Sequence, residues 1–341
     1  MSDLAHPDAE RHPEWHYTLD DFKSTDEVMQ TCLDLARVAA KTDLPILILG
    51  ETGTGKTMLA RAIHNTSSRA TAPFVAFNSA ALSDTLLDSQ LFGHEKGAFT
   101  GAMRRVKGKF ELADGGTLFI DEIADMSATA QAKILRAVEY GEFERLGSEQ
   151  LLTADVRLIS ATHLPINRYL ETDHFRKDLF YRISGITLRV PSLRQRQHDL
   201  GSLIASEIAT AAAAQGKTIV GVNRAAMDRL TSHGWPGNLR ELKRVMHTAV
   251  AVTEGDVILP EALLLETGTD ATAPLPTPLP ESIPAILPSS EDLSLAGAED
   301  RHIRFVLGYC GGNKRRAARL LGVSRSTLDR KLGKVSGMAS E

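Results

Sequence analysis

The sequence predicts an α/β domain built on a parallel sheet, followed by a helical subdomain and a small all-α module. Three observations indicate this. Five short, apolar segments alternate with stretches of helical periodicity, which is typical of a parallel sheet covered on both faces. A region with helical patterns but no apolar strands follows them. A proline-rich segment at 267–290 then separates this globular part from a basic C-terminal stretch.

The strand segments are short and continuously apolar. They are Leu44–Leu49, Pro73–Phe77, Thr117–Ile120, Val156–Ile159 and Ile186–Val190. Helical patterns stand between or before them at Thr25–Ala40, Met58–Ser67 and Ala128–Tyr140. The helical subdomain is predicted from three further patterns at Leu203–Ala214, Arg224–Ser232 and Asn238–Val252.

Composition excludes several classes of protein. The 341 residues are 43% hydrophobic and 24% charged, a balance that excludes wholesale disorder. No run of eighteen apolar residues occurs, and the polar N-terminus lacks the pattern of a signal peptide, so we expect a cytoplasmic protein. Cys32 and Cys310 are the two cysteines, which excludes a disulfide framework and a cysteine-based zinc site.

The charge is unevenly distributed. From Arg301 to Glu341, ten basic residues against two acids give a charge of +8. The rest of the chain, with 29 basic against 41 acidic residues, carries −12. An acidic body with a basic tail favours one module for chemistry and another for nucleic acid, although a merely solvated tail explains the count equally well.

The loop after the first strand matches a phosphate-binding motif in full. Gly50–Thr57 reads GETGTGKT, between an apolar strand and a helix. Glycines let backbone N–H groups surround phosphates, and the helix N-terminus adds partial positive charge. Lys56 is expected to reach the β- and γ-phosphates of ATP, and Thr57 to bind Mg²⁺. The predicted nucleotide-binding residues of the loop are Gly50, Glu51, Thr52, Gly53, Thr54, Gly55, Lys56 and Thr57.

A second motif supplies carboxylates. Thr117–Ile123 reads TLFIDEI, an apolar strand that ends in two acids. Asp121 is expected to hold Mg²⁺, and Glu122 to polarise the attacking water. A strand that simply ends in solvated acids is the alternative, which the phosphate loop upstream disfavours.

The basic tail contains a helix-turn-helix pattern at 312–332, GNKRRAARLLGVSRSTLDRKL. Helical periodicity predicts a buried side formed by Ala317, Ala318, Leu320 and Leu321. Gly322 permits the tight turn, Val323 packs it, and Ser324 is expected to cap the next helix. Leu328 and Leu332 continue the buried side, and an earlier helix at Ile303–Cys310 is available for a dimer contact. The residues expected to face DNA are Arg325, Ser326, Thr327, Arg330 and Lys331.

Several strings together resemble one family. Leu91–Ala102 reads LFGHEKGAFTGA, and this is similar to the bacterial enhancer-binding proteins, the AAA+ ATPases that activate sigma-54 RNA polymerase. The resemblance extends through GKFELADGGTLFIDEI, FRKDLFYRI and WPGNLREL, and the tail resembles the Fis-type module of the same family. It covers roughly 25–266 and the C-terminal module, and it implies an AAA+ fold with a helical lid.

The resemblance also implies residue roles. Asn78 would restrain Glu122 and couple it to the contact loops, and Thr162 and His163 would form the first sensor. Arg176 and Arg182 match the arginine-finger segment, which acts across a subunit boundary. Arg240 would be the second sensor, in the lid.

The resemblance assigns contact with sigma-54 to the GAFTGA loop: Gly97, Ala98, Phe99, Thr100, Gly101 and Ala102. The glycines permit a tight, mobile loop, and we expect Phe99 at an exposed tip, where a partner protein would cover it. A buried Phe99 in a structural turn is the alternative. Arg145–Gln150 stands in the place of a second contact loop.

The predicted organisation is a polar extension at 1–21, an AAA+ α/β subdomain at 22–190, a lid at 191–266, a proline-rich linker at 267–290 and a helix-turn-helix domain at 291–341. The short extension leaves no room for a receiver or sensor domain, so control is expected from expression level or from a regulatory protein in trans. The expected function is ATP-driven activation of the sigma-54 RNA polymerase holoenzyme by a ring, expected to be a hexamer, bound to upstream double-stranded DNA. The alternatives are a DNA-binding repressor or scaffold and a remodelling chaperone.

Overall fold

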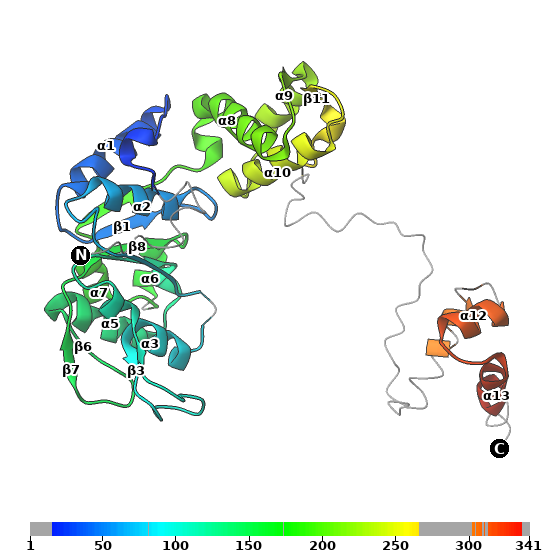
Figure 1. Cartoon of the computed structure of the whole chain (residues 1–341), viewed down its shortest axis with the longest axis horizontal. Helices are drawn as coiled ribbons and strands as arrows, with labels where there is room; N and C mark the ends of the chain where they lie inside the picture. The colour runs from blue at the N-terminus through cyan, green and yellow to red at the C-terminus, as the bar shows by residue number, and fades with distance from the viewer. Residues whose placement is uncertain are drawn as a thin grey trace. The chain divides into compact units, whose positions relative to one another are not determined.

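The computed structural model describes residues 16–80, 82–172, 174–265, 302–303, 305–308, 310 and 313–335. Two compact units divide the chain, Met1–Gly268 and Thr269–Glu341, and each is described by itself (Figure 1). The extension expected at 1–21 falls mostly outside the described residues, and the linker expected at 267–290 falls wholly outside them. Within the described part of the chain, no helix has both the length and the apolar content needed to cross a membrane.

A five-stranded parallel sheet forms the centre of the first unit, in the order β2-β5-β8-β1-β9. The strands are β1 (Ile46–Leu49), β2 (Phe74–Asn78), β5 (Thr117–Asp121), β8 (Arg157–Thr162) and β9 (Ile186–Arg189). All five apolar segments predicted as strands are therefore confirmed. Because every strand is parallel, all five carboxyl ends lie at one edge of the sheet, where the phosphate loop begins.

Helices cover both faces of this sheet (Figure 1). The helices of one face are α1 (Glu27–Ala40) and α2 (Lys56–Thr66), and those of the other are α3 (Asp84–Phe92), α5 (Ala128–Tyr140) and α7 (Lys177–Ile183). Successive strand side chains enter opposite cores: Ile46 and Ile48 pack with α1 and α2, whereas Leu47 packs with the other layer. This burial on both sides explains why the strands read as continuous apolar runs.

Two short hairpins extend from the α/β part, and neither was predicted. One pairs β3 (Gly93–His94) with β4 (Val106–Lys107), and the other pairs β6 (Glu142–Glu144) with β7 (Leu151–Thr153). Short helices complete this part: η3 (Leu19–Asp21), α4 (Lys109–Leu112), η4 (Ile123–Asp125) and α6 (Ile166–Glu171). The first hairpin carries the GAFTGA loop, and the second carries Arg145–Gln150.

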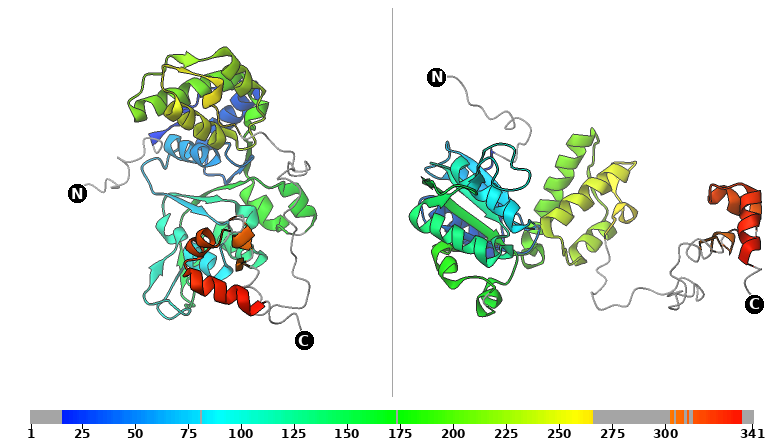
Figure 2. Two further views of the ribbon diagram at one scale, coloured as in Figure 1. Left: turned by 90° about the vertical axis from the view of Figure 1, so that its right-hand side faces the viewer. Right: turned by 90° about the horizontal axis from the view of Figure 1, so that it is seen from below.

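The lid is a separate helical core, built around Trp235 (Figure 2, yellow-green to yellow). Its elements are η5 (Leu193–Gln195), α8 (Gln197–Gln215), β10 (Gly221–Val222), α9 (Arg224–Ser232), α10 (Asn238–Val252), β11 (Val257–Ile258) and η6 (Pro260–Ala262). α8 begins six residues before the predicted start at Leu203. Its first turn is polar, so no apolar periodicity marks the start of the helix. Asp199 in this turn accepts hydrogen bonds from Ser24 and from the backbone N–H of Thr25.

The second unit contains α12 (Lys314–Leu320) and α13 (Arg325–Val335). Ala317, Ala318 and Leu328 are buried between them as predicted, but Leu320 is 58% exposed, so its predicted place in the core is wrong. The helix ends there, and Leu321, also predicted on the buried side, packs against the core. The turn chemistry is confirmed: Gly322 has φ +65°, and Ser324 Oγ accepts a hydrogen bond from the backbone N–H of Thr327.

Candidate nucleotide site and contact loops

The phosphate loop joins β1 to α2 at the carboxyl edge of the sheet. Gly53 and Gly55 have φ of +79° and +97°, values that favour glycine over other residues. Gly55 is the N-cap of α2, so the first N–H groups of this helix open into the loop. The loop is further fixed by Thr54, whose hydroxyl donates to the carbonyl oxygen of Glu51 over 2.8 Å. This geometry is that of an anion cradle.

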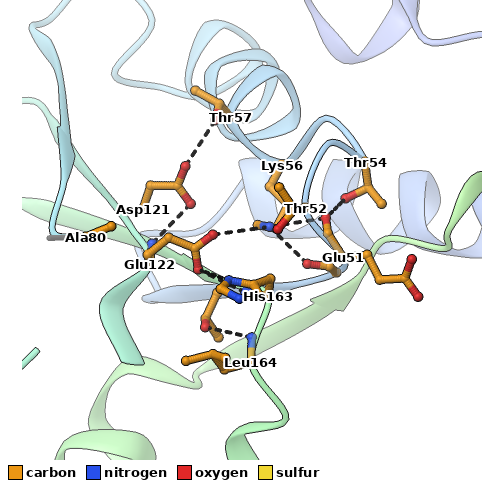
Figure 3. A network of polar contacts seen from close by, with 12 residues as sticks. Glu51, Thr52, Thr54, Lys56, Thr57, Ala80, Asp121, Glu122, His163 and Leu164 are labelled. Atoms are coloured by element: carbon orange, nitrogen blue, oxygen red, sulfur yellow. Dashed lines mark hydrogen bonds and ion pairs between the residues drawn. The ribbon is translucent and has the colours of Figure 1, made fainter. Parts of the chain in front are cut away.

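Lys56 is 6% exposed and lies between the loop and the acidic strand end. Its Nζ donates to the carbonyl oxygens of Gly50 (2.9 Å) and Glu51 (3.3 Å), and lies 3.8 Å from Glu122 Oε1 (Figure 3). Burial lowers the pKa of Lys56, while the charge of Glu122 opposes that shift. Phosphate oxygens would replace the two carbonyls as partners of a buried cation.

Asp121 ends β5 with its carboxylate turned toward α2. Its Oδ2 lies 3.5 Å from Thr57 Oγ1, which donates to it (Figure 3). Burial raises the pKa of Asp121, and the neighbouring charge of Glu122 raises it further. A hydroxyl and a carboxylate at this spacing are oxygen ligands of the kind that Mg²⁺ prefers, and a cation would relieve the crowded negative charge. The residues present therefore fit the metal.

Glu122 stands in the left-handed backbone region, with φ +56°. Its Oε2 accepts a hydrogen bond from the backbone N–H of His163 (3.1 Å) and lies 2.7 Å from His163 Nδ1 (Figure 3). Asn78 pairs in register with Asp121 on the neighbouring strand, and its Oδ1 accepts from the backbone N–H of Ala80. In the described part of the chain, the Glu122 carboxylate is thus contacted by His163 and Lys56, whereas the amide oxygen of Asn78 caps its own turn.

Ser79 is a site residue that the sequence analysis missed. Its Oγ lies 2.9 Å from the carbonyl oxygen of Asp121 and 2.7 Å from that of Glu122, and its backbone N–H donates to Asp121 as well. It therefore fixes the backbone of both acids from the end of β2. A serine directly after a strand carries no motif, so only the pairing of β2 with β5 reveals it.

The two predicted sensors lie on opposite sides of the loop. Thr162 is fully buried at the end of β8, where its carbonyl oxygen accepts from Gly50 and its hydroxyl accepts from the backbone N–H of Leu164. Arg240 is exposed on the first turn of α10. It is close enough to Lys56 for its charge to help lower the pKa of that lysine.

The two predicted finger arginines lie at opposite ends of α7, with Arg182 in its last turn. Arg176 is its N-cap and pairs with Asp178 through two hydrogen bonds, of 3.1 and 2.7 Å. Arg182 donates to the carbonyl oxygens of Val138 and Glu139, at the end of α5. These partners lie outside the phosphate loop of the same chain.

Buried Gln131 is a second residue that the sequence analysis missed. Its Oε1 accepts from the backbone N–H of Arg176 over 2.8 Å. Its Nε2 donates to the carbonyl oxygens of Met126 and His174. This one amide therefore holds the finger segment against α5. Nothing in the local sequence distinguishes it from any other glutamine on a helix.

The GAFTGA loop forms a tight turn above the β3–β4 hairpin. Gly97 and Gly101 have φ of +86° and +107°, and the N–H of Gly97 donates to the carbonyl oxygen of Ala102. Thr100 is exposed at the turn. Phe99 is half-buried, with its ring 5.0 Å from that of His94 in an edge-to-face contact. The prediction of Phe99 at an exposed tip is therefore met only in part, because buried His94 provides an aromatic partner.

The second loop packs on the first. The N–H of Glu95 donates to the carbonyl oxygen of Leu146, and a Cβ on Gly147 would lie 2.8 Å from the Cβ of Ala98. Arg145, 3% exposed, bonds Glu95 over 3.1 Å and also pairs with Glu111. Paired carboxylates offset the cost of burying this guanidinium. The two hairpins thus form one packed unit.

The predicted DNA-facing residues begin α13. Arg325 and Ser326 are exposed, whereas Thr327 and Lys331 are half-buried. The side chain of Arg330 lies outside the described residues. Arg325 and Lys314 both approach Asp329, at 3.8 and 2.9 Å. The start of this helix therefore presents a cation and a hydroxyl to solvent.

Three family models match the sequence: the Sigma-54 interaction domain at 22–189, the AAA+ ATPase lid domain at 194–274, and the Fis family of bacterial regulatory proteins at 294–334. The chain is 42% identical to the transcriptional regulatory protein ZraR of Escherichia coli (strain K12) over 306 residues, which are 90% of this chain and 67% of ZraR. It is 40% identical to the Nif-specific regulatory protein of Klebsiella pneumoniae, over 92% of this chain and 58% of that protein.

Solved structures agree with these sequence matches. The crystal structure of NtrX from Brucella abortus in complex with ADP is 32% identical, with a TM-score of 0.66 over 92% of this chain and 68% of NtrX. The complex of NtrX with ATP gives a TM-score of 0.65, over 92% and 69%. The chain therefore belongs to the bacterial sigma-54-dependent transcriptional activators, a family of AAA+ ATPases, and carries a Fis-type helix-turn-helix.

Proposed function

We propose that this protein hydrolyses ATP to activate sigma-54 RNA polymerase, with the GAFTGA loop as the part that engages sigma-54. The observation that carries the proposal is the coexistence of two sites on one subdomain. Lys56, Asp121 and Glu122 converge at the phosphate loop, and an exposed Thr100 stands on a hairpin of the same subdomain. ATP hydrolysis at the nucleotide site would supply free energy, and a partner bound to the solvent-facing loop could be moved by it.

At the nucleotide site, Lys56 would leave the carbonyls of Gly50 and Glu51 and bind the β- and γ-phosphates of ATP. Thr57 and Asp121 would hold Mg²⁺, which neutralises charge on the phosphate oxygens. Glu122, released from His163, would orient a water and accept its proton as the oxygen attacks the γ-phosphorus. The bond from that phosphorus to the ADP oxygen breaks, which yields ADP and phosphate.

A further cation, an arginine that neutralises charge on the γ-phosphate, would come from a neighbouring subunit. Arg176 and Arg182 pair with Asp178 and with the end of α5 in their own chain, so each has to exchange these partners to reach another subunit's phosphates. An arginine that meets the γ-phosphate in trans makes activity depend on assembly. A homo-oligomeric ring, a hexamer by resemblance, is the assembly that we propose.

A short mechanical path supports coupling between the two sites. Ser79 contacts the carbonyl oxygens of Asp121 and Glu122, and α3 (Asp84–Phe92) follows it closely in the chain. β3 begins directly after α3 and leads into the GAFTGA loop. A movement of the acids on hydrolysis would therefore be passed to the hairpin through α3.

The helix-turn-helix would tether the ring to upstream double-stranded DNA through the exposed start of α13. A repressor or scaffold that uses the AAA+ fold only to oligomerise is the second candidate, and the converging Lys56, Asp121 and Glu122 argue against it. A remodelling chaperone without promoter specificity would have no use for this module.

The test is paired measurement on Thr100→Ala. The substitution removes a hydroxyl and a methyl group from an exposed turn, so ATP binding, assembly and hydrolysis should stay within a few-fold of wild type. Open-complex formation at a sigma-54 promoter should collapse. Thr100→Ser is the matched control, because it keeps the hydroxyl. Normal open-complex formation by Thr100→Ala would contradict the coupling role, and a wild-type protein that never engages sigma-54 would favour the repressor.

A further inference from the structure

The lid contacts the phosphate loop through a small hydrogen-bonded group of residues centred on Asn238. We call this group, Asn238 with Glu51 and Arg194, the joint. Asn238 opens α10 with φ +50° and is 1% exposed. Its Nδ2 donates to the carbonyl oxygen of Thr52 (3.0 Å) and to Glu51 Oε2 (3.3 Å). Its Oδ1 accepts from the backbone N–H of Leu193, over 2.7 Å. One buried amide therefore joins the phosphate loop, the entry to the lid and the first turn of α10.

The backbones on either side of this amide are in direct contact. The N–H of Leu239 donates to the carbonyl oxygen of Gly53 over 2.9 Å. A Cβ on Gly53 would lie 2.3 Å from the carbonyl oxygen of Gly237, so the loop has no room to move toward the lid. Movement of Gly53 toward the lid must therefore displace the turn that carries Arg240.

An ion pair closes the outer side of the joint. Arg194 Nη1 donates to Glu51 Oε2 over 2.8 Å, and its second terminal nitrogen also pairs with the Glu51 carboxylate. This contact lowers the pKa of Glu51 and raises that of Arg194. Both side chains are about half exposed, so the pair alone adds little stability. Buried Asn238 is the stronger element, because losing a buried hydrogen-bond partner costs more.

The same residue, Glu51, faces both the lid and the catalytic lysine. Its carboxylate accepts from Arg194 and Asn238, while its carbonyl oxygen accepts from Lys56 Nζ over 3.3 Å. A bound phosphate would draw Lys56 away from that carbonyl. The segment that is freed is the segment to which the lid is attached.

We propose that Asn238, together with Glu51 and Arg194, is a positioning joint that converts occupancy of the phosphate loop into a position of the lid, and hence of Arg240. The inference rests on the proposed function, since it requires ATP in this loop. The amide of Asn238 is engaged by Thr52, Glu51 and Leu193, so it would not bind a phosphate itself. It acts by keeping α10 in register with the loop, so its loss should affect the discrimination of ATP from ADP more than the chemical step.

Asn238→Gly is the principal variant, because glycine keeps φ +50° without strain and removes only the amide. The affinity for ATP relative to ADP should fall by about tenfold, which is the size expected for a lost buried hydrogen-bond partner. KM for ATP should rise in parallel, and kcat should change little. Asn238→Asp should be worse, since a carboxylate would face Glu51.

The matched control is Asn223→Gly, which removes the amide that caps α9 in the lid away from the loop. It should lower thermal stability without changing the ratio of ATP to ADP affinity. If Asn238→Gly does not fold, Arg194→Gln tests the same joint from its exposed side. It should shift the ratio by about two- to fivefold.

Equilibrium titration with ATP and ADP separates the possible outcomes. If Asn238→Gly and Arg194→Gln both kept the wild-type ratio of ATP to ADP affinity, the proposed role of the joint would be refuted. If Asn223→Gly changed the ratio as much as Asn238→Gly, general loosening of the lid would be the cause and the proposed role of the joint would again be refuted. ATP binding by Lys56→Ala at wild-type affinity would instead contradict the proposed function.

Discussion

The packing of the two contact loops allows a quantitative test with Gly147→Ala. Gly147 has φ +75°, a conformation that costs a residue with a Cβ roughly 1–2 kcal/mol. The added Cβ would also lie 2.8 Å from the Cβ and 3.0 Å from the Cα of Ala98, where carbon atoms normally keep about 3.5–4 Å. The two loops must therefore separate by on the order of 1 Å.

Gly115→Ala is the matched control, with φ +72° and no atom within 4 Å of the added Cβ. Both variants should lose about 1–2 kcal/mol of unfolding free energy in urea. Gly147→Ala should lose about 1–3 kcal/mol more, through the clash with Ala98. ATPase should survive in both, but open-complex formation should fall only in Gly147→Ala. Equal open-complex formation by the two variants would refute the view that the loops act as one packed unit.

Four further outcomes are expected. Glu122→Gln should bind ATP and turn it over slowly, because an amide accepts no proton; normal turnover would contradict its role as base. Arg176→Ala or Arg182→Ala, whichever removes the finger, should reduce ATPase on the order of 10³-fold, and wild-type ATPase per subunit should rise with protein concentration; a flat profile would rule out action in trans. Deletion of 291–341 should abolish specific DNA binding and spare ATPase, and full-length binding should weaken with salt at a log–log slope of about −0.9 per phosphate contact; site-specific binding by the truncated protein would overturn the module assignment. Burial lowers the pKa of His64 from 6.5 to about 4, so protons bind the unfolded chain preferentially between these values and stability falls as pH drops. Urea unfolding should show a loss of about 2 kcal/mol from this group between about pH 7 and pH 5, absent in His64→Gln; an equal loss in that variant would show that His64 is not the cause.

The sheet and the phosphate loop were predictable because their signals are local. Each strand is apolar on both faces, and glycine is favoured at Gly53 and Gly55 by the positive φ of the loop. The hairpins were missed because β3 and β4 have two residues each, too few for a period-2 pattern. The motif alone is therefore sufficient to identify the phosphate-loop residues.

The contacts that organise the site join residues far apart in the chain. His163 and Glu122 are 41 positions apart, and Asn238 and Glu51 are 187 apart. No periodicity relates such positions, so only the folded sheet and lid bring them together. The exposure of Phe99 was overestimated for the opposite reason. Flanking glycines suggested exposure, whereas His94, five residues earlier, shelters the ring.

The anchoring of the finger segment by Gln131 has a consequence for assembly. Because this amide fixes the backbone at both His174 and Arg176, the segment is already ordered in a lone subunit. Joining a neighbour then requires exchange of side-chain partners and no folding of the backbone. Assembly of the proposed ring should accordingly proceed as docking of preformed surfaces, with little entropic cost for ordering this segment and association rates in the ordinary range for proteins, about 10⁵–10⁷ M⁻¹s⁻¹.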